Sequence, residues 1–142
     1  MQPWVLPALG ATGFITVHYL FLRAASGRLN DSLGALVLEG ATAIGIALSY
    51  LVGLRGPSVA TSRSGLLFAA ISGLAISGAS ILLFTTLRRR GPVASTGTIV
   101  MGGGVSLSAL LAPLIFGEPM TPRRALGVAL GVAAIFVLAR EG

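Results

Sequence analysis

Residues 65–87 read GLLFAAISGLAISGASILLFTTL, a stretch of apolar and small side chains without a single charge. An α-helix rises 1.5 Å per residue, so roughly 20 such residues match the hydrocarbon core of a bilayer, which is about 30 Å thick. Lipid offers the backbone no hydrogen-bond partner, whereas a helix satisfies its own amide and carbonyl groups. The stretch therefore predicts a transmembrane helix.

The rest of the chain repeats this pattern. Apolar stretches alternate with short gaps that hold arginine, glycine and proline, and they cover residues 4–22, 33–54, 65–87, 93–116 and 122–139. Hydrophobic residues make up 54% of the chain and charged residues 10%, against about 25% charged residues in soluble domains. We therefore predict an all-α integral membrane protein of the inner or plasma membrane, a single domain over residues 1–142 with five transmembrane helices.

The charged residues give a net charge of +6 but do not form one basic surface. With five helices, six arginines fall on the side of the C-terminus and four on the side of the N-terminus. The positive-inside rule then favours a cytoplasmic C-terminus only slightly, which predicts a chain able to insert in both orientations. Arginines divided between two membrane faces are expected to contact lipid headgroups and not nucleic acid.

Several kinds of chemistry are excluded by composition. The sequence holds no cysteine and one histidine, so thiolate chemistry and a histidine metal cluster within one chain are not available. Serines are frequent, but no base is placed to activate one, and no carboxylates are paired at a useful spacing. We expect neither an enzyme nor a bound cofactor or metal.

The 20 glycines predict close helix packing, because small residues let helix backbones approach each other in a membrane. Gly127 and Gly131 form a G-x-x-x-G pair, which favours contacts within the chain or between chains. The run Gly102, Gly103, Gly104 is expected to loosen its helix locally. This run favours either a hinge at a central pathway or close packing, and the sequence leaves both open.

Glu39 is the acidic residue that lies well inside an apolar stretch, about seven residues in and roughly 10 Å along the helix axis. An acidic side chain at such a position costs on the order of 2.5–3.5 kcal/mol of insertion free energy, and it usually serves a proton relay, an ion site or a substrate contact. The alternative is a position nearer the membrane surface, where Glu39 pairs with Arg23 or Arg28.

Three further residues are candidates for the same site. His18 is expected either to lie in an interfacial belt beside Tyr19 or to pair with Glu39 as a proton relay. Ser49 and Tyr50 are candidates for the lining of a cavity, and Tyr50 is equally an interfacial anchor.

The gaps also carry specific expectations. Glu118 is expected to cap a helix or to pair with Arg123 or Arg124, and the arginines at 88–90 are expected to contact lipid phosphates. Thr121 is a candidate N-cap for a helix with Pro122 in its first turn.

Residues 82–138 carry a set of family motifs. Leu87 is followed by three arginines and by Gly91, Pro92 and Val93; Gly117, Glu118 and Pro119 open a Gly-Glu-x-x-Thr turn; Gly127 and Gly131 are the spaced glycines of the last helix. In these features the stretch resembles the second part of an EamA-type repeat of the drug/metabolite transporter superfamily. Glu39 stands where many members of that superfamily carry arginine.

Most members have ten helices, in two five-helix repeats of opposite orientation, so the resemblance implies a half-size transporter. Its partner would be a second copy in an antiparallel homodimer, or a homologous inverted subunit. The dimer would move a small metabolite or drug-like molecule by proton exchange, with Glu39 of each subunit as the shared proton and substrate site. Two alternatives stay open: a subunit of a lipid-carrier flippase with a different partner chain, and a non-transporting membrane scaffold assembled through its glycine stripes.

Overall fold

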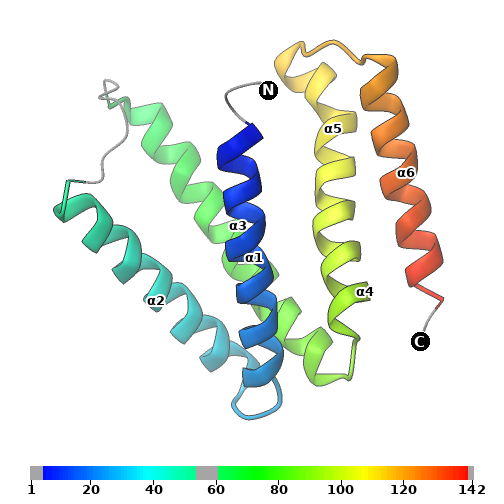
Figure 1. Cartoon of the computed structure of the whole chain (residues 1–142). Helices are drawn as coiled ribbons and strands as arrows, with labels where there is room; N and C mark the ends of the chain where they lie inside the picture. Colours follow the sequence, from blue (N-terminus) through cyan, green and yellow to red (C-terminus); the bar gives the residue numbers. More distant parts are fainter. Residues whose placement is uncertain (1–4, 54–60, 141–142) are drawn as a thin grey trace. The chain divides into compact units, whose positions relative to one another are not determined.

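The computed structural model describes residues 5–53 and 61–140. In these residues the chain is helical and contains no strand; the elements are α1 (Val5–Ala25), α2 (Asp31–Leu51), α3 (Arg63–Arg88), α4 (Val93–Gly97), η1 (Thr98–Gly102), α5 (Gly103–Phe116) and α6 (Pro122–Leu138). The elements α4, η1 and α5 follow one another without a gap and form one helix, in which η1 is a π-helical turn. Figure 1 shows the helices coloured in chain order.

Four helices in the described residues are long and apolar enough to cross a membrane. They are α1 and α2 with 21 residues each, α3 with 26, and the continuous helix Val93–Phe116 with 24. The helix α6 has 17 residues, about 25 Å at the standard rise, which is slightly less than the hydrocarbon thickness. The all-helical, multi-pass character is as expected from the sequence, and the fifth span stays a prediction.

Side-chain caps set the start of two helices. The helix α2 begins at Asp31, two residues before the expected start, because the side chain of Asn30 accepts hydrogen bonds from the first free amides. The helix α6 begins at Pro122, and the hydroxyl of Thr121 accepts a hydrogen bond of 3.3 Å from the amide of Arg124. The expected N-cap and first-turn proline of this helix are therefore confirmed.

The first helix extends beyond its expected end. The helix α1 continues three residues past position 22, to Ala25, so that Arg23 lies in its last turn. Trp4 and Leu54, the expected outer ends of the first two spans, lie outside the described residues.

Contacts between helices divide the chain into two compact units, which we describe separately. Among the described residues, the first unit holds residues 5–21 and 89–140, and the second holds residues 22–53 and 61–88. In the first unit α6 packs against α5 and η1, and in the second α2 packs against α3. The expectation of one domain over residues 1–142 stays a prediction.

The distribution of side chains suits lipid as the solvent. Large apolar side chains are exposed along the long helices, among them Leu36 (69%), Leu74 (75%) and Leu114 (82%). The buried positions include small polar side chains, namely Ser80, Ser95, Thr96 and Ser106. In water such a chain would present extensive apolar surface, whereas lipid tails match that surface and small polar residues suit the contacts between helices.

Candidate functional site

The pair α2–α3 places Glu39 opposite Ser80. The hydroxyl of Ser80 donates a hydrogen bond of 2.5 Å to Oε1 of Glu39, and Ser80 is buried while Glu39 is half-buried. Eight residues separate Glu39 from Asp31, the first residue of α2, so Glu39 lies about 12 Å along the axis. The alternative in which Glu39 pairs with Arg23 or Arg28 is wrong, because the partner of its carboxylate is Ser80.

The end of the same helix pair is held by an ion pair. Nε of Arg88 donates to both carboxylate oxygens of Asp31 at 2.9 and 3.0 Å, and the hydroxyl of Thr85 donates to Oδ2 at 2.9 Å. The Asp31 side chain is 14% exposed and that of Arg88 50%. Arg88, expected from the sequence at lipid phosphates, is therefore held by a carboxylate within the chain.

Two further side chains satisfy the C-terminal end of α3. Nη1 of Arg23 donates a hydrogen bond of 2.5 Å to the carbonyl of Leu87, and the hydroxyl of Ser26 donates one of 3.3 Å to the carbonyl of Phe84. The last carbonyls of a helix lack partners within the helix, and a cation there is favoured by the helix dipole. Arg23 is thus used to cap α3.

The two polar contacts between α2 and α3 belong to one antiparallel alignment. Asp31 and Glu39 are eight residues apart on α2, and Ser80 and Arg88 are eight residues apart on α3. The ion pair at the helix ends therefore fixes which residue of α3 faces Glu39.

A glycine allows the two helices to approach closely between these contacts. A Cβ atom at Gly34 would lie 2.7 Å from Cε1 of Phe84 and 2.8 Å from Cδ1 of Leu29. Phe84 is 3% exposed, so its ring has little room to move away. A larger residue at position 34 would push α2 and α3 apart and lengthen the contact between Glu39 and Ser80.

The structure places His18 in the first unit and Glu39 in the second, so their pairing as a proton relay stays a prediction. The His18 ring is half-buried and meets the ring of Tyr19 edge to face, with centroids 5.4 Å apart. Tyr19 itself is buried, and its ring lies 3.6 Å from the position that a Cβ atom of Gly97 would occupy.

Ser49 and Tyr50 lie near the C-terminal end of α2, away from Glu39. Ser49 is ten residues further along the helix, which is about 15 Å. Its hydroxyl donates a hydrogen bond to the carbonyl of Gly45, and the side chain of Tyr50 is 60% exposed. Neither residue therefore joins the Glu39 contact, and their role in lining a cavity stays a prediction.

The glycine run follows directly on the π-helical turn η1. Gly102 is the last residue of that turn, and Gly103 opens α5. A Cβ atom at Gly103 would meet Cδ1 of Ile135 at 3.6 Å, an ordinary contact between helices. Single π-helical turns inside α-helices occur frequently at functional sites. The arrangement is compatible with both expectations for the run, a hinge and close packing.

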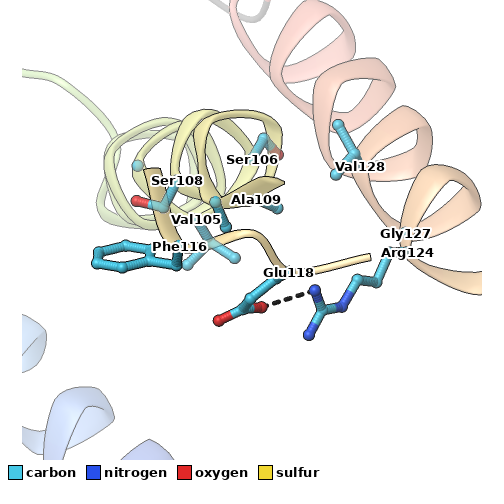
Figure 2. A pocket seen from close by; sticks show the side chains of 11 residues that line it. Val105, Ser106, Ser108, Ala109, Phe116, Glu118, Arg124, Gly127 and Val128 are labelled. Atoms are coloured by element: carbon cyan, nitrogen blue, oxygen red, sulfur yellow. Dashed lines mark ion pairs between the residues drawn. The ribbon is translucent and has the colours of Figure 1, made fainter. Parts of the chain in front are cut away.

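An open groove between α5 and α6 is a second candidate site, in the first unit. Its volume is about 690 Å³, within the range of roughly 300–1,000 Å³ that is typical of ligand pockets. Figure 2 shows its lining, which consists of Gly104, Val105, Ser106, Ser108, Ala109, Ala112, Phe116, Glu118, Arg124, Gly127 and Val128. The sequence motifs single out Gly104, Glu118 and Gly127 separately, but they do not indicate the groove.

The family-like turn forms one rim of this groove. Gly117 ends α5 in the left-handed conformation, with φ of 66°, which favours glycine. Oε2 of Glu118 and Nη1 of Arg124 lie 2.6 Å apart, and Nη1 also donates to the carbonyl of Pro119 at 3.3 Å. Arg124 is therefore the partner of Glu118, one of the possibilities expected from the sequence (dashed line in Figure 2).

The two glycines of the G-x-x-x-G pair have different surroundings. A Cβ atom at Gly131 would lie 2.6 Å from Oγ of Ser106, so Gly131 is a point of close approach between α6 and α5. A Cβ atom at Gly127 would meet nothing within 4 Å, and Gly127 lines the groove.

No group of three or more His, Asp or Glu side chains that could hold a metal ion occurs in the part of the chain that the structure describes. Comparison with known proteins adds no relative: no family model, no curated protein and no solved structure matches the chain.

Proposed function

We propose that the chain is a half-size, proton-coupled transporter that resembles one repeat of the drug/metabolite transporter superfamily. Two copies of opposite orientation, each with five spans, form the working unit in the cell membrane. Glu39 of each subunit is the shared site for a proton and for a small metabolite or drug-like molecule.

The hydrogen bond between Ser80 and Glu39 is the observation that supports this proposal most directly. A hydroxyl both donates and accepts, so Ser80 can donate to the Glu39 carboxylate and accept from the protonated acid. The guanidinium of Arg88 only donates, and it bonds both carboxylate oxygens of Asp31 in an ion pair. Glu39 therefore has a partner that suits both states of a proton-exchanging group, whereas Asp31 has the partner of a structural carboxylate.

The depth of Glu39 also supports a transport site. Glu39 lies about 12 Å along α2 from Asp31, at the start of the helix, and an acidic residue at such depth is usually kept for function. Transporters built from inverted repeats bind their substrates near the membrane midplane, where the two repeats meet. Two inverted copies would bring two Glu39 side chains to that region.

The distribution of arginines supports insertion in both orientations. Six arginines against four give a weak orientation signal. One arginine from each set is taken by an ion pair, Arg88 by Asp31 and Arg124 by Glu118. Removal of one arginine from each set leaves the difference in arginine number between the two membrane faces unchanged and small.

Transport by reconstituted protein tests the role of Glu39. Vesicles with an imposed pH gradient are assayed for uptake of tetraphenylphosphonium, a lipophilic cation, and of a panel of amino acids. We expect pH-driven uptake of at least one compound by the unmodified protein, partial uptake by Glu39→Asp and none by Glu39→Gln. Ser77→Ala serves as the control within the spans, because the Ser77 hydroxyl bonds only within its own helix, to the carbonyl of Gly73, and belongs to neither candidate site. Full pH-driven uptake by a normally inserted Glu39→Gln protein would rule out this mechanism.

A further inference from the structure

The groove between α5 and α6 is lined by a largely buried serine whose hydroxyl has no hydrogen-bond partner in the part of the chain that the structure describes. Ser106 is 6% exposed and lines the groove, and no hydrogen bond joins its hydroxyl to another described residue. Every fully enclosed polar side-chain atom in the described residues has a partner, so the Ser106 oxygen is not fully enclosed. Buried hydroxyls normally find a hydrogen-bond partner, and the groove is where a partner for Ser106 can come from.

The conformation of Ser106 differs from that of other hydroxyls in these helices. The hydroxyls of Thr12, Thr42, Ser49 and Ser77 each donate to the carbonyl four residues earlier, which is the usual local solution for such side chains. The Ser106 oxygen instead points toward α6, where the missing side chain of Gly131 leaves room for it. The hydroxyl therefore makes no hydrogen bond within its own helix, and Ser106 lines the groove, so we take it as the group that a molecule in the groove would bind.

The opposite end of the groove is charged. The Glu118 and Arg124 side chains are 46% and 45% exposed, so both still present polar atoms to solvent. Together they offer an acceptor for an ammonium group beside a planar donor for an acid group. Charge complementarity at this rim thus favours a group that carries both charges.

Between its two polar ends the groove has apolar walls, formed in part by Ala109, Ala112, Phe116 and Val128. Ten residues of α5 separate Ser106 from Phe116, which corresponds to about 15 Å along the helix. Few, well-placed polar groups in a mostly apolar pocket are typical of sites for drug-sized molecules.

We propose that this groove binds an elongated small molecule with a zwitterionic end, an apolar body and a hydrogen-bonding group at the far end. The ammonium and acid groups bind Glu118 and Arg124, the body lies along the apolar walls, and the far group binds the Ser106 hydroxyl. The groove shares no residue with the Glu39 contact, and its assignment does not depend on the transport proposal. An acyl lipid fits less well, because its hydrocarbon chain would leave the Ser106 hydroxyl without a partner.

Binding of two matched probes tests the inner end of the site. Hydroxybiphenylalanine carries a zwitterionic amino-acid end, two rings and a terminal hydroxyl, and biphenylalanine lacks only that hydroxyl. Their affinities for the full chain in lipid nanodiscs are measured by equilibrium dialysis. We expect the hydroxylated probe to bind roughly threefold to tenfold more tightly, as one added hydrogen bond implies. Ser106→Ala should abolish this difference, because it keeps Cβ and removes only the hydroxyl.

The rim and the walls are tested with the same probes. N-acetylation removes the ammonium group, so the acetylated probe should bind the unmodified protein more weakly than the free amino acid does. The affinity of the acetylated probe should be the same for the unmodified protein and for Glu118→Gln. Gly127→Leu should weaken binding of both probes at least about tenfold, because a Cβ atom there meets nothing within 4 Å and the longer side chain would occupy part of the groove. Gly10→Leu is the matched control, since a Cβ atom there also meets nothing within 4 Å and Gly10 does not line the groove.

The outcomes separate the proposal from its competitors. Unchanged probe binding by Gly127→Leu would place the ligand elsewhere. If Ser106→Ala still bound the hydroxylated probe more tightly than the probe without the hydroxyl, the proposed contact with the Ser106 hydroxyl would be excluded. Displacement of the probes by phospholipid, with no effect of N-acetylation, would show that the groove is a lipid site and would overturn the assignment to a small zwitterion. Unchanged binding by Glu39→Gln is expected, because the groove acts independently of that carboxylate.

Discussion

Oγ of Ser80 lies 2.5 Å from Oε1 of Glu39, and the ion pair between Asp31 and Arg88 lies eight residues away along both helices. The two contacts therefore differ in position along the helices and in chemistry. The outer contact joins two opposite charges at the helix ends. The inner contact joins a carboxyl group to a hydroxyl, so it depends on a single hydrogen bond from Ser80.

Replacement of Ser80 by alanine should destabilise the chain, because Glu39 would lose the donor to its carboxylate. We expect the free energy of unfolding to fall by about 1–2 kcal/mol, as is typical when a hydrogen bond between membrane helices is lost. Titration with sodium dodecyl sulfate in mixed micelles measures the change. Ser77→Ala is the control, because the Ser77 hydroxyl bonds only within its own helix, to the carbonyl of Gly73. Equal losses for the two variants would contradict the importance of the contact with Glu39.

Gly34→Ala should be more damaging than the same change at Gly40 in the same helix. A Cβ atom at Gly34 would lie within 3 Å of Phe84 and Leu29, whereas one at Gly40 would meet nothing within 4 Å. Overpacking of this kind costs about 1–3 kcal/mol, while Gly40→Ala should be neutral or slightly stabilising. The same unfolding titration applies, and a tolerated Gly34→Ala would show that α2 and α3 are less closely packed than described.

Gly131→Ala should destabilise the contact between α5 and α6, and Ser106→Ala should restore much of the loss. The new Cβ atom would lie 2.6 Å from Oγ of Ser106, and removal of that oxygen relieves the conflict. We expect a loss of about 1–2 kcal/mol in the single variant and a favourable coupling in the double-mutant cycle. Additive effects of the two substitutions would argue against direct contact.

The scaffold alternative makes a contrasting prediction for Gly127. A scaffold held together by its glycine stripes should lose assembly when Gly127 becomes leucine, and it should tolerate loss of Glu39. If Gly127 serves to line the ligand groove, as we propose, Gly127→Leu should leave the oligomeric state unchanged in size-exclusion chromatography. Dissociation of the dimer by this substitution would favour the scaffold.

Insertion in both orientations can be measured with single cysteines, since the chain has no cysteine of its own. Thr61 and Arg89 are exposed residues in two successive gaps between helices, so Thr61→Cys and Arg89→Cys report opposite membrane faces. Ser95 is unsuitable for labelling, because it is only 5% exposed. An antiparallel homodimer predicts that an impermeant reagent labels about half of each variant from either face. Labelling of each site from one face only would exclude the homodimer and favour a different partner chain.

The helices could be predicted from the sequence because their signal is local. A stretch such as residues 65–87 has the length and apolarity of a membrane span by itself. The cap at Thr121 was equally accessible, since a hydroxyl followed by proline is a local pattern.

Partners across helices could not be predicted in the same way. The selection of Ser80 by Glu39 depends on which faces of α2 and α3 meet, and that choice is made by the ion pair between Asp31 and Arg88 and by the close approach at Gly34. In the sequence Ser80 is only one of several small residues in the stretch 65–87. The groove was also missed, because it arises from the separation of α5 and α6 around Gly127.

The π-helical turn Thr98–Gly102 has a geometric consequence for the helix that contains it. A π turn holds one residue more than an α turn, and each residue of an α-helix occupies about 100° around the axis. On one side of this turn Gly97 faces Tyr19, and on the other side Ser106 faces Gly131. Conversion of the turn to regular α geometry would rotate these two segments relative to each other about the helix axis. A switch between π-helical and α-helical hydrogen bonding at this point would thus change which side chains the two segments present to their neighbours. The length of the helix would change by no more than the rise of one residue.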